Sequence, residues 1–253
     1  MIDVWYFLKK ELMESWRHYR VMILGLVFLL FGIESPLIAK ITPDLLKAVG
    51  GQLKFSLPNP TSVQAWQQFF KNMTQIGIYL LAVITSNTVS QEVSRGTLVN
   101  LISKGLPRYA IIIAKYVMAM LLWFGAILFS FLVTWVYTAY YFPDHYTPHV
   151  WLGVLPLLLF GFLFMAITIF GSTLTRSDFV GFFIAVGAAI FLTLLGFIKH
   201  LKRWNPISLV SDNMAITQGT EHFTRLIPAY AATLVLASIF IIWAVQVLNY
   251  KKL

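Results

Sequence analysis

The chain has 253 residues, of which 58% are hydrophobic and only 11% are charged, and its mean hydropathy is +0.76. A soluble domain carries about 25% charged residues, so this apolar surplus is too large for one globular core. The composition excludes a soluble globular protein and indicates an integral membrane protein. The net charge of +9 does not indicate a nucleic-acid partner, because the basic residues flank apolar runs. Anionic membrane lipids and topology account for them.

The first 20 residues are predicted to form an amphipathic helix that lies in the membrane interface. Trp5, Leu8, Leu12 and Trp16 follow one another by steps of three and four residues, which places them on one helix face. No short apolar core with a small-residue cleavage site is present, so we expect no cleaved signal peptide. The helix is interpreted as a membrane-surface anchor.

Six stretches are apolar enough to be candidate membrane spans, because a spanning helix needs about 20 mostly apolar residues. They cover about residues 21–39, 74–90, 109–141, 151–174, 179–198 and 227–248. Glu34 and Pro36 interrupt the outer end of the first stretch, which makes it the weakest of the six. The predicted fold class is an all-α polytopic membrane protein with six transmembrane helices, organised as one transmembrane domain over residues 1–253.

The distribution of basic residues predicts that both termini are cytoplasmic. Of the 19 Lys and Arg residues, eleven then lie on inner segments and eight on outer segments. The inner segments are also shorter, so the bias agrees with the positive-inside rule. An even number of spans gives the same result. We expect a multi-pass protein of a bacterial plasma membrane.

Residues 91–108 are predicted to stay in the cytoplasm, because each charged residue would cost about 2.5–3.5 kcal/mol at the bilayer centre. Leu98, Leu101 and Ile102 have the spacing of a short amphipathic helix. Gly105 is a candidate stop signal for this helix, and Pro107 suits the first turn of the next one. Two interpretations remain open: a helix lying on the headgroups, and a docking element for a soluble partner.

The stretch EVSRGTLVNLISKGLPRYAIIIAK resembles the cytoplasmic loop of type-two ATP-binding-cassette (ABC) exporter permeases. The positions that match that pattern are Glu92, Gly96, Thr97, Leu98, Leu101, Pro107, Arg108 and Lys115. Residues 57–77 are similar to the family's approach to its second span, and residues 205–219 to its short outer helix before the last span. The resemblance therefore covers nearly the whole chain.

The resemblance implies an export pore formed by two permease subunits, either a homodimer or a pair with a similar permease, and driven by two cytoplasmic ATPase subunits. The loop helix would be a coupling helix that sits in a groove of the ATPase. The residues assigned to this coupling are Glu92, Arg95, Gly96, Thr97, Leu98, Leu101, Ile102, Pro107 and Arg108. We therefore expect Leu98→Asp combined with Leu101→Asp to detach the ATPase and leave the permease in the membrane.

The chain contains no G-x-x-x-x-G-K-[ST] phosphate loop, so we expect no ATP hydrolysis by this polypeptide. ATP and magnesium would be bound by the partner ATPase, and we expect no cofactor in this chain. No catalytic motif is present either. Asp144, His145 and His149 lie close together in the sequence, but Pro148 breaks helical spacing and no metal site is predicted.

Polar and small residues inside the spans suggest two further roles. Glu34, Ser86 and Asn87 are candidates for a transport path or its entrance; a carboxylate reaching water, or hydrogen bonding between helices, is the alternative. Gly181, Ala185 and Ala189 form a small-residue stripe at four-residue spacing. This stripe would allow close packing within one subunit or against the second copy.

The sparse buried charge favours a largely apolar path and hydrophobic or amphipathic cargo, such as toxic or antimicrobial peptides, drugs or lipids. Two other functions are considered. An ion-coupled secondary transporter would need broken helices near the membrane centre, or buried carboxylates. A non-transporting membrane anchor would carry the same docking helix without a dimeric path.

Overall fold

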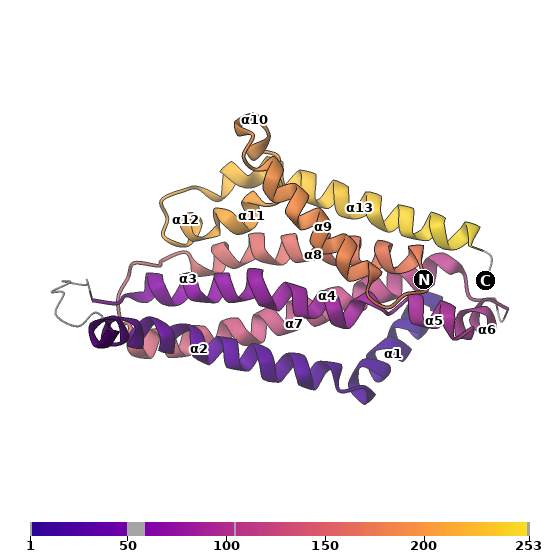
Figure 1. Cartoon of the computed structure of the whole chain (residues 1–253), viewed down its shortest axis with the longest axis horizontal. Coiled ribbons are helices and arrows are strands. Elements are labelled where there is room, and N and C mark those ends of the chain that lie inside the picture. Colours follow the sequence, from indigo (N-terminus) through magenta and orange to yellow (C-terminus); the bar gives the residue numbers. More distant parts are fainter. Residues whose placement is uncertain (1, 50–58, 104, 252–253) are drawn as a thin grey trace.

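The computed structural model describes residues 2–49, 59–103 and 105–251, and 82% of these residues are helical. No strand occurs in these ranges, so the predicted all-α class is confirmed. Figure 1 shows a bundle of long, roughly aligned helices with shorter helices at both of its ends. The first half contains α1 (Ile2–Arg17), α2 (Arg20–Val49), α3 (Ser62–Asn72), the π-helix η1 (Met73–Gly77), α4 (Ile78–Ser86), α5 (Ser90–Ser94) and α6 (Thr97–Ser103).

The second half of the chain contains the two longest buried helices and the shorter helices that follow them. These elements are α7 (Arg108–Tyr141), α8 (Val150–Leu174), α9 (Val180–Leu195), α10 (Lys199–Lys202), α11 (Ser208–Ser211), α12 (Asn213–Thr217), η2 (Phe223–Leu226) and α13 (Ile227–Tyr250). The start of α1, the end of α13 and the α5–α6 pair lie together at what we call the termini end (Figure 1). The opposite, loop end holds residues 142–149 and α10–α12.

Four helical segments are long and apolar enough to cross a membrane: Arg20–Leu45, Arg108–Tyr141, Val150–Leu174 and Phe223–Tyr250. They correspond to the first, third, fourth and sixth predicted spans. In the region of the second, α3, η1 and α4 follow one another without a gap, but the regular α-helical part α4 has only nine residues. The fifth is the 16-residue helix α9. The count of six spans therefore stays a prediction.

Helix α2 continues through Pro36, where the sequence suggested that the first span is interrupted. Proline cannot donate the helical hydrogen bond to the carbonyl four residues earlier, which belongs to Gly32. Thr134 Oγ1 on α7 donates to that carbonyl at 3.1 Å. A side chain of a neighbouring helix thus replaces the missing donor, and α2 extends to Val49 rather than ending near residue 39.

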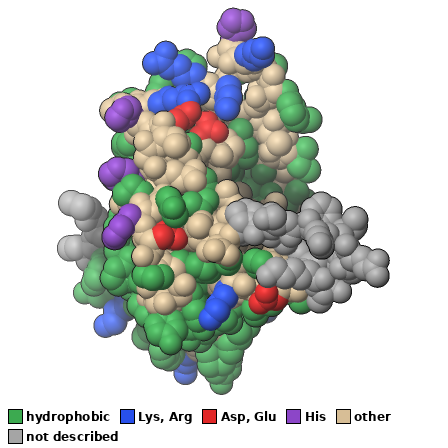
Figure 2. Space-filling view, turned by 90° about the vertical axis from the view of Figure 1, so that its left-hand side faces the viewer, with side chains coloured by type: hydrophobic (Ala, Val, Ile, Leu, Met, Phe, Trp, Pro, Cys, Tyr) green, Lys and Arg blue, Asp and Glu red, His purple; other side chains and the backbone are tan. Residues whose placement is uncertain are grey.

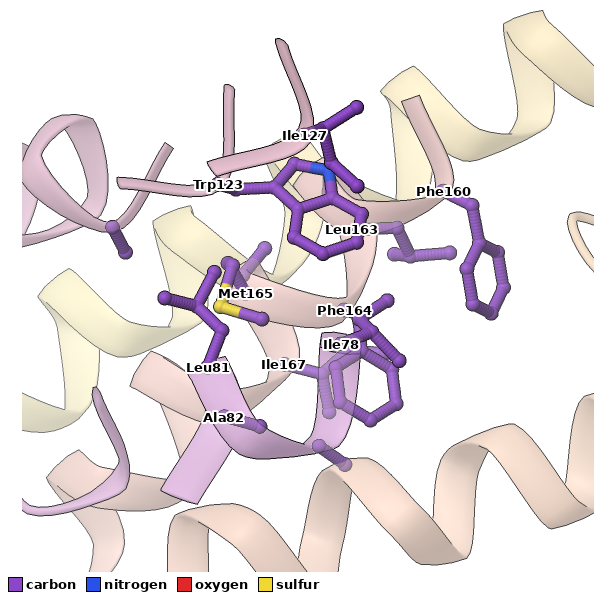
Figure 3. Packing of buried hydrophobic residues seen from close by; sticks show 14 of the residues in the cluster. Ile78, Leu81, Ala82, Trp123, Ile127, Phe160, Leu163, Phe164, Met165 and Ile167 are labelled. Atoms are coloured by element: carbon purple, nitrogen blue, oxygen red, sulfur yellow. The ribbon is translucent and has the colours of Figure 1, made fainter. Parts of the chain in front are cut away.

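Helix α8 forms the centre of the bundle, since 72% of its apolar window is buried, against 28% for α2 and 22% for α13. Figure 3 shows Phe164 and Met165 of α8 among the side chains of α4 and Trp123 of α7. The Trp123 indole donates to the Leu158 carbonyl at 3.3 Å. A Cβ at Gly161 would lie 2.0 Å from the indole nitrogen, so glycine makes room for the ring.

We expect Gly161→Ala to lower the melting temperature of the purified protein in detergent, because the buried Trp123 would have to move. Overpacking of this kind typically costs about 1–3 kcal/mol. The matched control is Gly125→Ala on α7, where a Cβ meets open space and alanine favours the helix. A Gly161→Ala protein that melts at or above the wild-type temperature would contradict the close packing of α7 on α8.

The loop end is joined to α3 by Asp144. Its carboxylate accepts a hydrogen bond from the backbone N–H of Ser62 at 2.8 Å and another from the Ser62 hydroxyl. It also accepts from the N–H of Tyr146 at 3.2 Å. A carboxylate at a helix N-terminus is favourable because it satisfies orphan N–H groups. Asp144 therefore fixes the start of α3, while His145 and His149 are exposed.

Candidate functional site

A buried ion cluster at the termini end connects three helices that are far apart in the sequence. Lys115 Nζ on α7 lies 2.9 Å from Glu11 Oε1 on α1 and 3.2 Å from Glu92 Oε2 on α5. The Lys115 side chain is 2% exposed, and the Glu11 and Glu92 side chains are 4% and 12% exposed. The contact to Glu11 is also a hydrogen bond, whereas Glu92 Oε2 has ion-pair distance without hydrogen-bond geometry. The cluster thus holds the start of the α5–α6 segment against α1 and α7.

Lys10 completes the cluster on its solvent side. Its Nζ lies 2.6 Å from Glu92 Oε1 and 3.2 Å from Glu14 Oε2. Burial alone would lower the pKa of Lys10, but the hydrogen bond and charge of Glu92, together with Glu11 and Glu14, raise it above the ordinary value. Burial would likewise raise the pKa of Glu14, but the charge of Lys10 lowers it below 4.5. The stabilisation from Glu14 is therefore present above pH 4.5 and is lost as the pH falls.

The three carboxylates of the cluster also have a spacing that could suit a metal ion. Oxygen atoms of Glu11, Glu14 and Glu92 lie within 4.8 Å of one another. The ammonium groups of Lys10 and Lys115 already lie at ion-pair distance from the same carboxylates. The charge of the cluster is thus largely balanced by the chain itself, and we assign the cluster to ion pairing.

Helices α5 and α6 form a hairpin whose turns depend on two glycines. Gly96 joins the two helices with φ +68°, and Gly105 follows α6 with φ +91°. Residues other than glycine rarely adopt these positive φ angles. The N–H of Gly105 bonds to the Ile102 carbonyl and the N–H of Leu106 to the Leu101 carbonyl. This pair of bonds is the Schellman motif. The predicted stop at Gly105 is confirmed.

The apolar face of α6 is turned into the chain, which differs from its predicted role as the docking face. Leu98 is 0% exposed, and Leu101 and Ile102 pack partly buried against the same hydrophobic core. The spacing of these three residues correctly predicts an apolar helix face, but this face packs against the hydrophobic core of the same chain. The exposed side of the hairpin includes Arg95, Thr97, Val99, Asn100 and Ser103. We call these five residues the hairpin face.

Two other residues assigned to coupling lie at the joints of the hairpin. The Thr97 hydroxyl donates to the Glu92 carbonyl at 3.2 Å, which ties the start of α6 back to α5. Pro107 has φ −71° and ψ 139° and directly precedes α7. An extended residue at this position ends the turn and sets the entry into α7.

The preceding end of α4 and the start of the hairpin are fixed to α8 and α9. The Ser172 hydroxyl oxygen on α8 accepts from the N–H groups of Val89 at 3.2 Å and Ser90 at 3.1 Å. The Ser86 hydroxyl donates to the Asp178 carbonyl, just before α9, at 2.8 Å. The hairpin is therefore attached to α8 by hydrogen bonds and to α1 and α7 by ion pairs.

Two cationic side chains cap the C-terminal ends of α13 and α8. Arg108 Nη1 donates to the carbonyls of Leu248 at 2.5 Å and Asn249 at 2.7 Å. Lys251 Nζ donates to the Thr173 carbonyl at 2.7 Å. Cations suit helix C-termini because the last carbonyls have no helical partner. Arg108, assigned above to coupling, thus binds the C-terminal helix of its own chain.

The residues predicted for a transport path are not brought together. Glu34 is half-buried on α2, whereas Ser86 is fully buried and donates to the Asp178 carbonyl. Hydrogen bonding between helices, the alternative considered for Ser86, accounts for it. Asn87 is half-buried, and its Oδ1 has no hydrogen-bond partner among the described residues.

The small-residue stripe of α9 is buried within the chain. A Cβ at Gly181 would lie 2.5 Å from the Thr168 carbonyl oxygen on α8 and 3.1 Å from the Ser86 carbonyl oxygen. Ala185 and Ala189 are 0% and 5% exposed. Packing within one subunit, one of the two roles considered, accounts for the stripe, and these residues present no surface to a second copy.

Sequence reasoning missed Glu11 and Lys10 as parts of the site. The sequence does contain a signal, since Phe7, Glu11 and Ser15 recur every four residues and form the buried face of α1. The face chosen from the sequence, with Trp5 and Trp16, is the exposed one. A helix that buries a glutamate and exposes tryptophans is typical of a surface that meets lipid.

The long apolar helices, the ion cluster and the hairpin together define a polytopic helical membrane protein with a structured contact surface at its termini end. The family model described as "ABC-2 family transporter protein" matches residues 5–248, and the chain belongs to this family. Members are membrane subunits that associate with ABC ATPase subunits and normally have no ATPase site of their own. No curated protein matches this chain.

Proposed function

We propose that this chain is the permease subunit of an ABC exporter, with its termini end in the cytoplasm and six membrane spans. The continuous α3–η1–α4 stretch would be the second span, and α9 would be the fifth. The observation that carries the proposal is the hairpin of α5 and α6. A hairpin that turns at glycines and is attached to three helices, α1, α7 and α8, is a rigid element rather than a loose loop.

Coupling in this proposal runs from the hairpin face into the ion cluster. An ATPase that moves the hairpin would pull on Glu92, and Glu92 contacts both Lys10 of α1 and Lys115 of α7. Because buried ion pairs are costly to separate, the three helices would move together. Such a packed element with two arrangements is what coupling between distant sites requires. Two ATPase subunits would supply ATP, magnesium and the driving force.

The path would lie between two copies of the chain. Helices α2 and α9 expose large apolar side chains, among them Met22, Leu26, Phe183 and Phe191. Apolar faces of this size need lipid or another protein surface. A homodimer with a largely apolar path suits hydrophobic or amphipathic cargo, such as peptides, drugs or lipids.

The topology and the docking face can be tested together, because the natural chain has no cysteine. A single Asn100→Cys substitution places one thiol on the hairpin face, and Thr220→Cys places one at the loop end; both positions are exposed. In intact cells, a membrane-impermeant maleimide should label the Thr220→Cys protein and leave the Asn100→Cys protein unlabelled. The reverse result would place the hairpin outside and contradict the proposal.

The same two variants test docking. A partner ATPase is first identified by gentle detergent purification from the native host. A bulky maleimide on the Asn100→Cys protein should then abolish co-purification of that ATPase, whereas the same label on the Thr220→Cys protein should not. Retention of the ATPase by both labelled proteins would assign docking to another surface. Reconstituted, ATP-dependent transport separates the permease from a membrane anchor, which would recruit the ATPase without moving cargo.

A further inference from the structure

A basic pocket lies at the loop end, where α10 projects beyond the upper end of α9 (Figure 1). It has a volume of about 360 Å³, within the range of small-molecule sites. Four cationic side chains line it: Lys199, Lys202, Arg203 and Arg225. Figure 2 views the molecule from this end and shows Lys and Arg side chains gathered near the top beside acidic side chains.

The chain neutralises only half of this positive charge. Lys202 Nζ lies 3.6 Å from Asp212 Oδ1, and Arg225 forms an ion pair with Glu221. Within the described ranges, Lys199 and Arg203 have no carboxylate within 4.0 Å. Two cations therefore remain to attract an anion at the mouth of the pocket.

Exposed apolar side chains lie next to the lining cations Lys199, Lys202 and Arg203 in the sequence. Phe197 is 80% exposed, and Leu194, Ile198, Leu201 and Trp204 are between 44% and 59% exposed. Leu194 is at the end of α9 and Leu201 is in α10, which carries two of the cations, and the other three residues directly flank α10. A soluble anion would gain nothing from such neighbours, whereas an amphiphile with an anionic head and apolar tails would contact both groups.

The position of the charge supports a ligand rather than a topological role. With the topology proposed above, the pocket is on the outer side of the membrane, where short loops usually carry fewer Lys and Arg residues. Four cations between α9 and α13 thus oppose the orientation signal of the rest of the chain. An anionic ligand on that side would offset this charge.

We propose that the pocket binds the phosphate headgroup of an anionic phospholipid from the outer leaflet. Lys199 and Arg203 would bind the phosphate, and the exposed residues of α9 and α10 would contact the acyl chains. The proposed topology decides only the leaflet; lipid binding itself can be measured on the purified chain whether or not it transports cargo.

The experiment measures binding of dioleoyl phosphatidylglycerol to the purified full chain in detergent by native mass spectrometry, with dioleoyl phosphatidylcholine as the neutral lipid. We expect preferential binding of phosphatidylglycerol. Lys199→Gln combined with Arg203→Gln should weaken phosphatidylglycerol binding about 25-fold, because each lost cation weakens it about fivefold. The control removes the same charge from two exposed lysines elsewhere, Lys9→Gln combined with Lys71→Gln, and should leave binding within about twofold.

Both variant pairs change exposed side chains, so their melting temperatures are compared first to verify the fold. Equal phosphatidylglycerol binding by the wild type and the pocket variant would overturn the proposal. A third arm offers glycerol 3-phosphate, the soluble headgroup without acyl chains. Binding of this compound as tightly as the lipid would reject the phospholipid and assign the pocket to a soluble phosphate.

Discussion

Replacing Lys115 by methionine is expected to destabilise the protein by about 3–5 kcal/mol, because it leaves buried carboxylates without their main cation. Lys115 has almost no contact with solvent and is the cation nearest to Glu11. Lys10 lies 3.4 Å from Glu11 but is half-exposed and is also bound to Glu92 and Glu14. The free energy of unfolding, measured by SDS titration in mixed micelles, checks the prediction.

A double-mutant cycle separates the ion pair from a simple packing defect. Glu11→Gln removes the charge that Lys115 compensates, so the combined variant should lose at least about 1 kcal/mol less than the sum of the single variants. Lys9→Met is the control, since Lys9 is exposed on the same helix as Glu11. Additive losses, or a Lys115→Met protein as stable as the Lys9→Met protein, would show that the cluster does not join α1 to α7.

The second large effect is expected for Leu98→Asp, which places a carboxylate in the hydrophobic core. Leu98 is 0% exposed, so the change removes a buried leucine and adds an unpaired charge. Loss of a buried leucine side chain alone typically costs about 2–5 kcal/mol, and the charge adds to this. We therefore expect little folded protein to be recovered, instead of the folded permease without its ATPase that the sequence predicted, measured as the monodisperse fraction on size-exclusion chromatography.

The adjacent residue provides a matched control for Leu98. Val99 is 42% exposed on the hairpin face, and Val99→Asp should change stability by no more than about 0.5 kcal/mol. The pair therefore distinguishes the two orientations of α6. If Leu98→Asp folds normally and Val99→Asp does not, the helix faces the opposite way and its apolar side is the exposed one.

The ion cluster explains why Glu92 and Lys115 belong to one motif although 23 positions separate them. Glu92 lies in the hairpin and Lys115 lies about two turns into α7, yet both belong to the same group of charges as Glu11. The hairpin can therefore be displaced only together with α1 and α7, or by separating buried ions. In the proposed function, this constraint would allow the hairpin to transmit motion to α1 and α7.

The features that depend on local chemistry could be predicted from the sequence. Long apolar runs predicted the four helices that are long and apolar enough to cross a membrane. Such a prediction is possible because about 20 consecutive apolar residues match the thickness of the bilayer core. Gly105 predicted the end of α6, since a positive φ angle is a property of a single residue. The loop motif identified the family because its residues are contiguous.

The tertiary structure decided the features that depend on residues far apart in the chain. Periodicity shows that Leu98 lies on an apolar helix face but not whether that face meets the chain's own core or a partner. Pro36 leaves the Gly32 carbonyl without its helical donor, and only the fold brings Thr134, 102 positions from Gly32, close enough to donate to it. In the sequence, Glu11 does not differ from other charged residues of an interfacial helix. Only the fold places Lys115 Nζ 2.9 Å from its carboxylate. The sequence by itself determined which segments are helical and apolar; which faces they bury was decided by packing, because burial is a property of both partners.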